Sequence, residues 1–188
     1  MIDPEALRDY FPLAASELRQ LGALFSPLRL DAGEPLLRQG SYHPRLAFVH
    51  TGYLRVHADV GGRDVTQWVV SPRSLVTDLA ALLYGQPARF TITALTDCTL
   101  ASIPASAYHD LARTLPGWLA AERSFLVHCF VTLEQRVQSF LALSARQRYD
   151  RLFAEQPELF NHVPLRYLAS MLGMTPETLS RIRSARTS

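Results

Sequence analysis

The sequence contains no lysine, so arginine supplies all 19 of its basic residues. It has only two cysteines, Cys98 and Cys129, which are too few for a disulfide framework or for an iron–sulfur cluster held by four thiolates. No window approaches the roughly 18 apolar residues of a membrane-spanning helix. Acidic residues stand near the start, at Asp3 and Glu5, where a signal peptide needs a basic region. We therefore expect a cytoplasmic protein with no membrane partner and no iron–sulfur cluster.

Charge is distributed unevenly along the 188 residues. Residues 1–143 contain 12 arginines and 13 acidic residues, a net charge of −1. Residues 144–188 contain seven arginines and four acidic residues, a net charge of +3. A basic segment that follows a nearly neutral one points to an anionic partner at the C-terminal end.

The hydrophobic pattern changes twice along the chain. Apolar residues recur at three- and four-residue steps near the start, which predicts a helix over residues 5–25. Residues 28–103 have a period of two with glycines between short runs, which is typical of an antiparallel β-roll or sandwich, and residues 79–83 fit a brief helix within it. After Pro104 the pattern is helical. We expect an α+β fold with an N-terminal antiparallel β-roll, flanking helices, one long helix and an all-α C-terminal domain.

Residues 119–140 contain no glycine or proline and predict the long helix. Its apolar residues are spaced by 7, 4, 3, 4 and 3 positions, a heptad seam that only Arg123 interrupts. Such a stripe can pack on the protein's own sheet or against the same helix of a second copy, and its length favours a homodimer. The predicted dimer interface consists of Leu119, Leu126, Phe130, Leu133, Val137 and Phe140.

Residues 165–183 predict two short helices around a turn. Pro164 can open the first helix, and Gly173 supplies the positive φ that ends it. Thr175 caps the second helix, and Pro176 stands at its first position, where a missing amide donor is harmless. These features together indicate a helix-turn-helix, although a helical hairpin without a role in DNA binding has a similar pattern.

The outward residues of the second helix are suited to reading DNA. Glu177 can accept from cytosine N4, and Arg181 can donate two hydrogen bonds to guanine. The two are four residues apart and share a face, so the alternative is an exposed ion pair worth about 0.3–0.5 kcal/mol. The candidate DNA-binding residues are Thr175, Glu177, Thr178, Ser180, Arg181 and Arg183.

The combination of a β-roll, a long helix and a terminal helix-turn-helix resembles the CRP/FNR family of bacterial transcription regulators. The resemblance is carried by residues 31–40, 48–56 and, most closely, 172–183, in which Glu177, Ser180 and Arg181 form an FNR-like pattern. It implies a roll of the cyclic-nucleotide-binding jelly-roll type and a homodimer that binds double-stranded DNA at a palindrome with TTGA-like half-sites. It also implies contact with RNA polymerase and no enzymatic activity.

The stretch that corresponds to the nucleotide pocket of this family departs from its Gly-Glu and Pro-Arg pattern. Thr77 and Asp78 stand in place of Gly-Glu, and Ala88 separates Pro87 from Arg89. On a strand, a displacement of one residue turns a side chain to the opposite face, so we expect Arg89 to point away from a bound phosphate unless a local bulge restores its direction. Cyclic nucleotide binding is therefore disfavoured. The candidate pocket residues are Asp78, Arg89, Thr91 and, on the long helix, Thr132.

The expected domains are a sensor roll at 1–115, a dimerisation helix at 116–143 and a DNA-binding domain at 144–188. The sequence continues for only five residues after Arg183, so we expect no wing hairpin with phosphate contacts. An alternative function is a sensor or interaction module that binds a small ligand such as cAMP and binds DNA weakly or not at all. A metal-dependent roll enzyme is disfavoured because no His-x-His pair is present, and no metal site is expected.

Overall fold

The first half of the chain folds into two four-stranded antiparallel sheets in the computed structural model, which describes residues 2–187 and their side chains up to residue 185. One sheet has the order β1 (Ser26–Leu30), β8 (Cys98–Pro104), β3 (Arg45–Thr51) and β6 (Leu75–Val76). The other has the order β2 (Pro35–Leu37), β7 (Thr91–Ala94), β4 (Leu54–Val60) and β5 (Arg63–Val70). The predicted antiparallel β-roll is thus confirmed.

The apolar residues that alternate along these strands form the core of the roll. Val49 of β3 and Leu100 of β8 meet Leu54 of β4 and Ile92 of β7 in one buried cluster. The brief helix predicted between the strands is α2 (Leu79–Tyr84). Asp78 caps its first turn, so this helix begins where a side-chain acceptor is available for its free amides.

The predicted helix over residues 5–25 is wrong in part. The structure has a 3-10 helix, η1 (Pro4–Leu7), and a separate helix, α1 (Ala15–Ala23). Pro12 explains the interruption, because it has no amide hydrogen and it disfavours helical backbone at the preceding residue. The extended link still has a packing role, since the ring of Phe11 lies 5.1 Å from the ring of Trp118.

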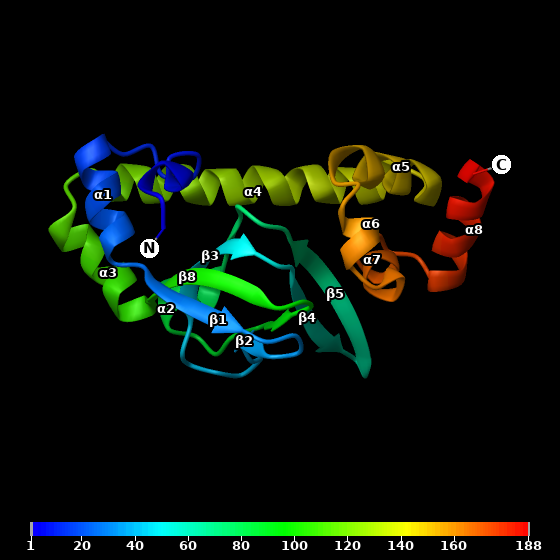
Figure 1. The fold of residues 1–188 in the computed structure, drawn as a ribbon, viewed down its shortest axis with the longest axis horizontal. Coiled ribbons are helices and arrows are strands. Elements are labelled where there is room, and N and C mark those ends of the chain that lie inside the picture. Colours follow the sequence, from blue (N-terminus) through cyan, green and yellow to red (C-terminus); the bar gives the residue numbers. More distant parts are fainter. Residues whose placement is uncertain (1, 188) are drawn as a thin grey trace.

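After the roll, α3 (Ala105–Thr114) leads into α4 (Trp118–Ala142), which confirms the long helix. Its 25 residues give it a length of about 38 Å at ~1.5 Å per residue. In Figure 1, α4 passes along the roll and continues to the C-terminal helices. Only its first two turns are buried, through Trp118, Ala121 and Phe125.

Four short helices complete the chain: α5 (Ala145–Glu155), α6 (Leu159–His162), α7 (Leu165–Met171) and α8 (Pro176–Thr187). They enclose a separate buried cluster that includes Tyr149, Leu159, Leu168 and Leu179. Tyr53 and Val69 of the roll also belong to this cluster, so the C-terminal helices pack directly against the roll. Among residues 2–187, no helix is both long and apolar enough to cross a bilayer.

Helix α7 contacts the roll along strand β5. The Thr66 amide donates to Ser170 Oγ at 2.9 Å, and the Arg55 guanidinium lies 4.1 Å from the centre of the Tyr167 ring. Arg55 is held in place on the hairpin, because its Nε and Nη1 donate to Thr66 and Asp64, each at 2.8 Å. The Arg55 hydrogen bond lowers the pKa of Asp64, so this pair is ionised at neutral pH.

Candidate nucleic-acid interface and effector pocket

Helix α8 lies at the end of the molecule farthest from the N-terminal helices (Figure 1). Its inner face is apolar, with Leu179 fully buried and Ile182 packed beside it. Its outer face is polar, since Glu177, Ser180 and Arg181 are all exposed. The alternation of apolar and polar positions along α8 therefore fixes which side chains face solvent.

The turn between α7 and α8 is built as its residues predict. Gly173 has φ +66°, and the Gly173 and Met174 amides donate to Ser170 and Ala169 at 3.0 Å, which is a Schellman ending. Thr175 accepts from the Thr178 amide at 3.2 Å and so caps α8. This turn sets the direction in which α8 leaves α7.

Glu177 and Arg181 are the acidic and the basic side chain of the outer face, and both are exposed. The hydrogen bond from its own backbone amide lowers the pKa of Glu177, and the Thr175 hydroxyl adds to this, so the carboxylate is ionised at neutral pH. The structure has no ion pair between Glu177 and Arg181 among the described side chains. Both groups are therefore available to an outside partner.

Six residues were predicted to bind DNA, and the structure separates them into two groups. Thr175, Glu177, Ser180 and Arg181 are exposed, whereas Thr178 and Arg183 are half-buried. The hydroxyl of Thr178 lies 3.2 Å from that of Thr175, within the cap. The four exposed residues form the part of α8 that a second molecule can reach.

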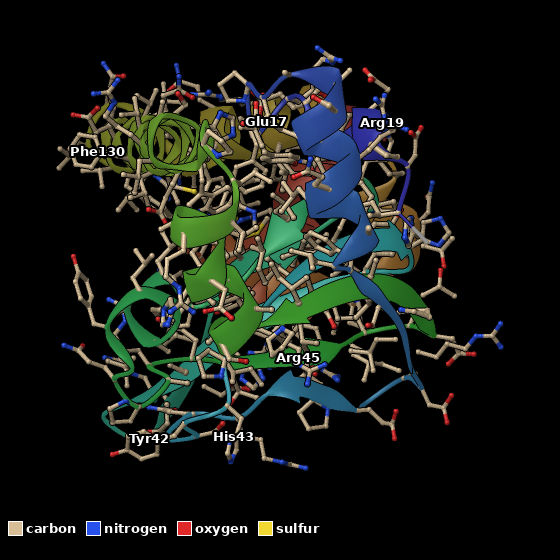
Figure 2. The ribbon with its side chains drawn as sticks, turned by 90° about the vertical axis from the view of Figure 1, so that its left-hand side faces the viewer. Glu17, Arg19, Tyr42, His43, Arg45 and Phe130 are labelled. Atoms are coloured by element: carbon tan, nitrogen blue, oxygen red, sulfur yellow. The ribbon has the colours of Figure 1, made fainter. Side chains whose placement is uncertain are left out.

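A second exposed surface is apolar and lies along α4. Leu119 is 66% exposed and Phe130 is 61% exposed, and Figure 2 shows Phe130 on the outer side of the helix, away from the roll. Leu133 and Val137 are also exposed, whereas Leu126 is half-buried. A contiguous apolar face of this kind is rare on a monomer and marks an interaction site. We call it the α4 face: Leu119, Phe130, Leu133, Val137, and two residues that the heptad pattern missed, Val127 and Leu141.

Phe140, the last residue of the predicted seam, contacts the C-terminal helices instead. Its ring lies between the guanidinium groups of Arg136, at 5.3 Å, and Arg148, at 5.0 Å. A Cβ atom on Gly173 would lie 2.6 Å from Phe140 Cε1. Phe140 thus connects the end of α4 to the turn before α8, a contact that no local pattern in the sequence predicts.

The candidate nucleotide residues Asp78 and Arg89 engage each other. The Asp78 carboxylate is 1% exposed and accepts from the Arg89 amide at 2.7 Å and from its Nε and Nη2 at 3.3 Å. The prediction that Arg89 points to the opposite face of a strand is wrong, because Arg89 lies in a bend before β7. Thr91 accepts from the Gln39 amide at 3.1 Å. The polar groups of these three residues therefore form hydrogen bonds with one another or with a neighbouring residue.

A cavity of about 390 Å³ lies between β5, β6 and α4. Its walls include Trp68, Val76 and His128, together with Thr132, the candidate residue on the long helix. The Thr132 hydroxyl donates to the His128 carbonyl at 2.9 Å. Asp78, Arg89 and Thr91 are not among the residues that line it, so the structure does not bring the four candidates together. Among the described residues, no group of three or more His, Cys, Asp or Glu could hold a metal ion.

We expect calorimetry to show no binding of cAMP or cGMP at micromolar concentrations. The carboxylate that would accept a ribose hydroxyl is buried and already accepts hydrogen bonds from Arg89, and breaking these costs about 1.5–3 kcal/mol each. Measured micromolar affinity for either nucleotide would contradict this interpretation of Asp78 and Arg89.

Comparison with known proteins supports the description of the roll. Residues 27–115 match the family described as the cyclic nucleotide-binding domain. Patatin-like phospholipase domain-containing protein 6 of Homo sapiens is 33% identical over 118 residues, which cover 57% of this chain and 8% of that protein. The chain thus spans less than a tenth of the length of the curated relatives it matches.

Solved structures match almost the whole chain. The c-di-GMP responsive global regulator CLP of Xanthomonas campestris has a TM-score of 0.70 at 17% identity, over 93% of this chain and 92% of that one. The catabolite activator protein of Thermus thermophilus has a TM-score of 0.60 at 21% identity, over 97% of this chain and 86% of that one. The chain therefore contains a roll of the cyclic nucleotide-binding domain type, and its fold as a whole is similar to the folds of these two structures.

Proposed function

We propose that the protein is a homodimeric, sequence-specific DNA-binding transcription regulator. The observation that carries the proposal is the exposed outer face of α8, where Glu177, Ser180 and Arg181 project from a helix whose other face is buried. In this proposal, residues 1–115 form the sensor, residues 116–143 the dimerisation helix and residues 144–188 the DNA-binding domain. The resemblance to CRP/FNR regulators extends the proposal to a cytoplasmic protein that contacts RNA polymerase and has no enzymatic activity.

The α4 face supports the dimer. Two copies that pair through this face bury large apolar side chains such as Phe130 and Val137, which are otherwise in water. Each buried side chain of this size contributes about 1.5–3 kcal/mol, so the pairing is favourable without any polar contact. A two-fold dimer presents two copies of α8, and recognition helices about 34 Å apart read a palindrome across one turn of DNA.

The chemistry of the outer face of α8 supports base readout. Arg181 has a free planar guanidinium that can donate to both O6 and N7 of guanine, and Glu177 is an ionised acceptor for cytosine N4. The exposed hydroxyls of Thr175 and Ser180 suit phosphate contacts, which position the helix without reading sequence. A palindrome of TTGA-like half-sites is the proposed target.

We expect Arg181→Ala to weaken binding to this palindrome and to remove discrimination at one G·C pair in each half-site. The loss of each bidentate contact corresponds to about 1–3 kcal/mol, or roughly 5- to 150-fold in affinity for each half-site. Fluorescence anisotropy measures this loss of affinity in titrations with the palindrome, with a scrambled duplex and with duplexes in which each G·C pair is substituted. Arg113→Ala, on α3 and far from α8, is the control. An equal loss on scrambled DNA would show that Arg181 contacts only phosphate.

A ligand-binding module with weak or absent DNA binding is the second candidate. The match of residues 27–115 to the cyclic nucleotide-binding domain and the cavity of about 390 Å³ beside α4 favour it. Salt dependence separates the two functions, because phosphate contacts make the logarithm of affinity fall steeply with the logarithm of salt concentration. Absence of any salt-sensitive binding to the palindrome would favour this second function.

A further inference from the structure

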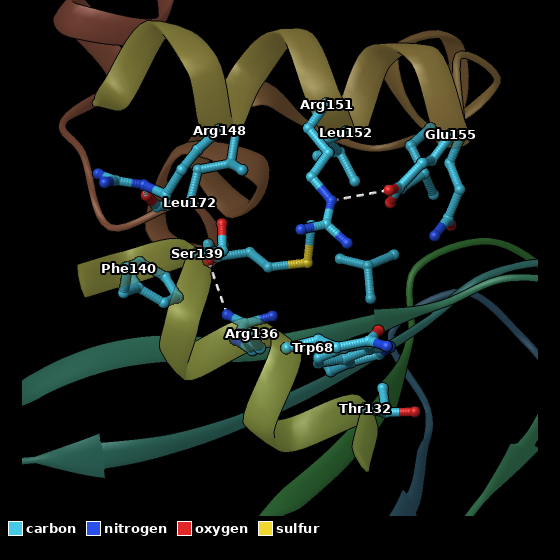
Figure 3. Close-up of a pocket in the computed structure, with 15 residues that line it drawn as sticks. Trp68, Thr132, Arg136, Ser139, Phe140, Arg148, Arg151, Leu152, Glu155 and Leu172 are labelled. Carbon is cyan, nitrogen blue, oxygen red and sulfur yellow. Dashed lines mark hydrogen bonds and ion pairs between the residues drawn. The ribbon is translucent and has the colours of Figure 1, made fainter. Parts of the chain in front are cut away.

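A second cavity, of about 260 Å³, lies where the roll meets the C-terminal helices. Trp68 of β5 and the last turns of α4 form its floor, and α5 forms its roof (Figure 3). Trp68 and Thr132 also line the cavity beside β6, but three arginines, Arg136, Arg148 and Arg151, line this cavity and not that one. Figure 3 shows Arg151 reaching from α5 toward Trp68, with Arg136 rising from α4.

Two of these arginines have no carboxylate partner among the described side chains. Arg136 donates to the Met171 carbonyl at 2.7 Å and lies 4.8 Å from the centre of the Trp68 ring. Arg148 donates to the carbonyls of Leu172, at 2.9 Å, and Leu143, at 2.7 Å. These partners are neutral, so both charges remain uncompensated in a partly enclosed site.

Arg151 is paired, but its partner is the single acid of the cavity. Its Nε donates to Glu155 at 2.8 Å across one helical turn. The lining therefore carries three positive charges and one negative charge. Burial lowers the pKa of Arg136 to about 10, which leaves it protonated at neutral pH. A charge held away from water without a counterion is costly, and a bound anion removes that cost.

We propose that this cavity binds a small organic or inorganic oxyanion, a carboxylate or a phosphate, with its charge toward Arg136 and Arg151. Guanidinium groups bind both of these anions through paired hydrogen bonds, which fits Arg136 and Arg151 lining one space from two different helices. Trp68, Leu152 and Met171 supply an apolar wall for the uncharged part of the ligand. The volume is below the usual 300–1,000 Å³ of sites for drug-sized molecules, so the ligand is small.

The position of the site gives the ligand a structural effect. It lies between Trp68 of the roll, Arg136 of α4, Arg151 of α5 and Met171 of α7, so one bound anion contacts all four elements. Binding would hold the C-terminal helices against the roll in the arrangement seen here. The proposal does not depend on DNA binding, because the site and its ligand are complete within one chain.

The test is calorimetric titration of the full chain, without DNA and at constant ionic strength, with inorganic phosphate, succinate and citrate. We expect at least one of them to bind with one site per chain. Arg151→Gln should weaken this binding at least 10-fold. Glu155→Gln, which removes the competing carboxylate, should strengthen it several-fold. Comparison of phosphate with the two carboxylates identifies the class of ligand.

Arg146→Gln is the matched control. Arg146 lies on the same helix and pairs with Asp150 four residues later, and its side chain is 45% exposed against 47% for Arg151, but it does not line the cavity. The affinity of the Arg146→Gln variant for the anion should stay within twofold of that of the unmodified protein. Thermal unfolding checks that each variant folds. Absence of binding by all three anions at millimolar concentration, or equal loss in Arg146→Gln and Arg151→Gln, would overturn the proposal.

Discussion

We expect replacement of Phe130 and Val137 by glutamate to convert the proposed dimer into monomers and to reduce affinity for the proposed palindrome more than about 100-fold. Both side chains lie on the α4 face, 61% and 49% exposed in the single chain. In a dimer through this face they lose their water contacts, so the substitution brings four carboxylates into an apolar interface, where buried charges without partners are costly. A monomer has one copy of α8, and loss of the second binding event removes a factor of about 10²–10⁴ in avidity.

Sedimentation equilibrium gives the mass of each variant, and anisotropy gives its affinity for DNA. Val60→Glu is the control, because Val60 is 58% exposed on the hairpin between β4 and β5 and does not belong to the α4 face. It should leave both mass and affinity unchanged. A double variant that still sediments as a dimer would place the dimer interface elsewhere.

Substitution of Gly173 by alanine destabilises the protein by about 3 kcal/mol, with two separable causes. The positive φ of +66° costs about 1–2 kcal/mol for any residue with a Cβ. The added Cβ would also stand 2.6 Å from the Phe140 ring, which is held between Arg136 and Arg148 and so cannot move freely. Such overpacking adds about 1–3 kcal/mol. Chemical unfolding measures the total.

Gly85→Ala isolates the first cause. Gly85 ends α2 with φ +63°, nearly the angle of Gly173, but a Cβ there meets nothing within 4 Å. It should cost only about 1–2 kcal/mol. In a Phe140→Leu background the cost of Gly173→Ala should fall toward the Gly85 value, because the smaller side chain relieves the contact. Equal costs at Gly85 and Gly173 would show that the Phe140 contact is unimportant.

Features of the fold that depend on neighbours in sequence were predictable. The turn before α8 is an example, because the roles of Gly173, Thr175 and Pro176 are set by backbone groups within three or four residues. The long helix was predictable for a similar reason, since no helix breaker interrupts residues 119–140. The predicted helix over residues 5–25 is divided at Pro12, a local signal that hydrophobic spacing does not contain.

Features that depend on distant residues were not predictable. The seating of α7 on β5 includes the hydrogen bond between Ser170 and Thr66, which are 104 residues apart. The pairing of Arg89 with Asp78 depends on the bend before β7, at a position where the sequence pattern predicts a strand. The cavity with three arginines requires β5, α4 and α5 to meet, and no segment of the sequence contains that information by itself.

Helix α4 is long enough that a small tilt at one end produces a large displacement at the other. Its first turns are fixed in the roll by Trp118 and Phe125, and its far end supports the helices that position α8. Over about 38 Å, a tilt of about 5° displaces the far end by about 3 Å, roughly the rise of one base pair. In the proposed complex with DNA, a change at the roll too small to repack its sheets would thus be large enough to shift α8 by one base-pair step along the groove.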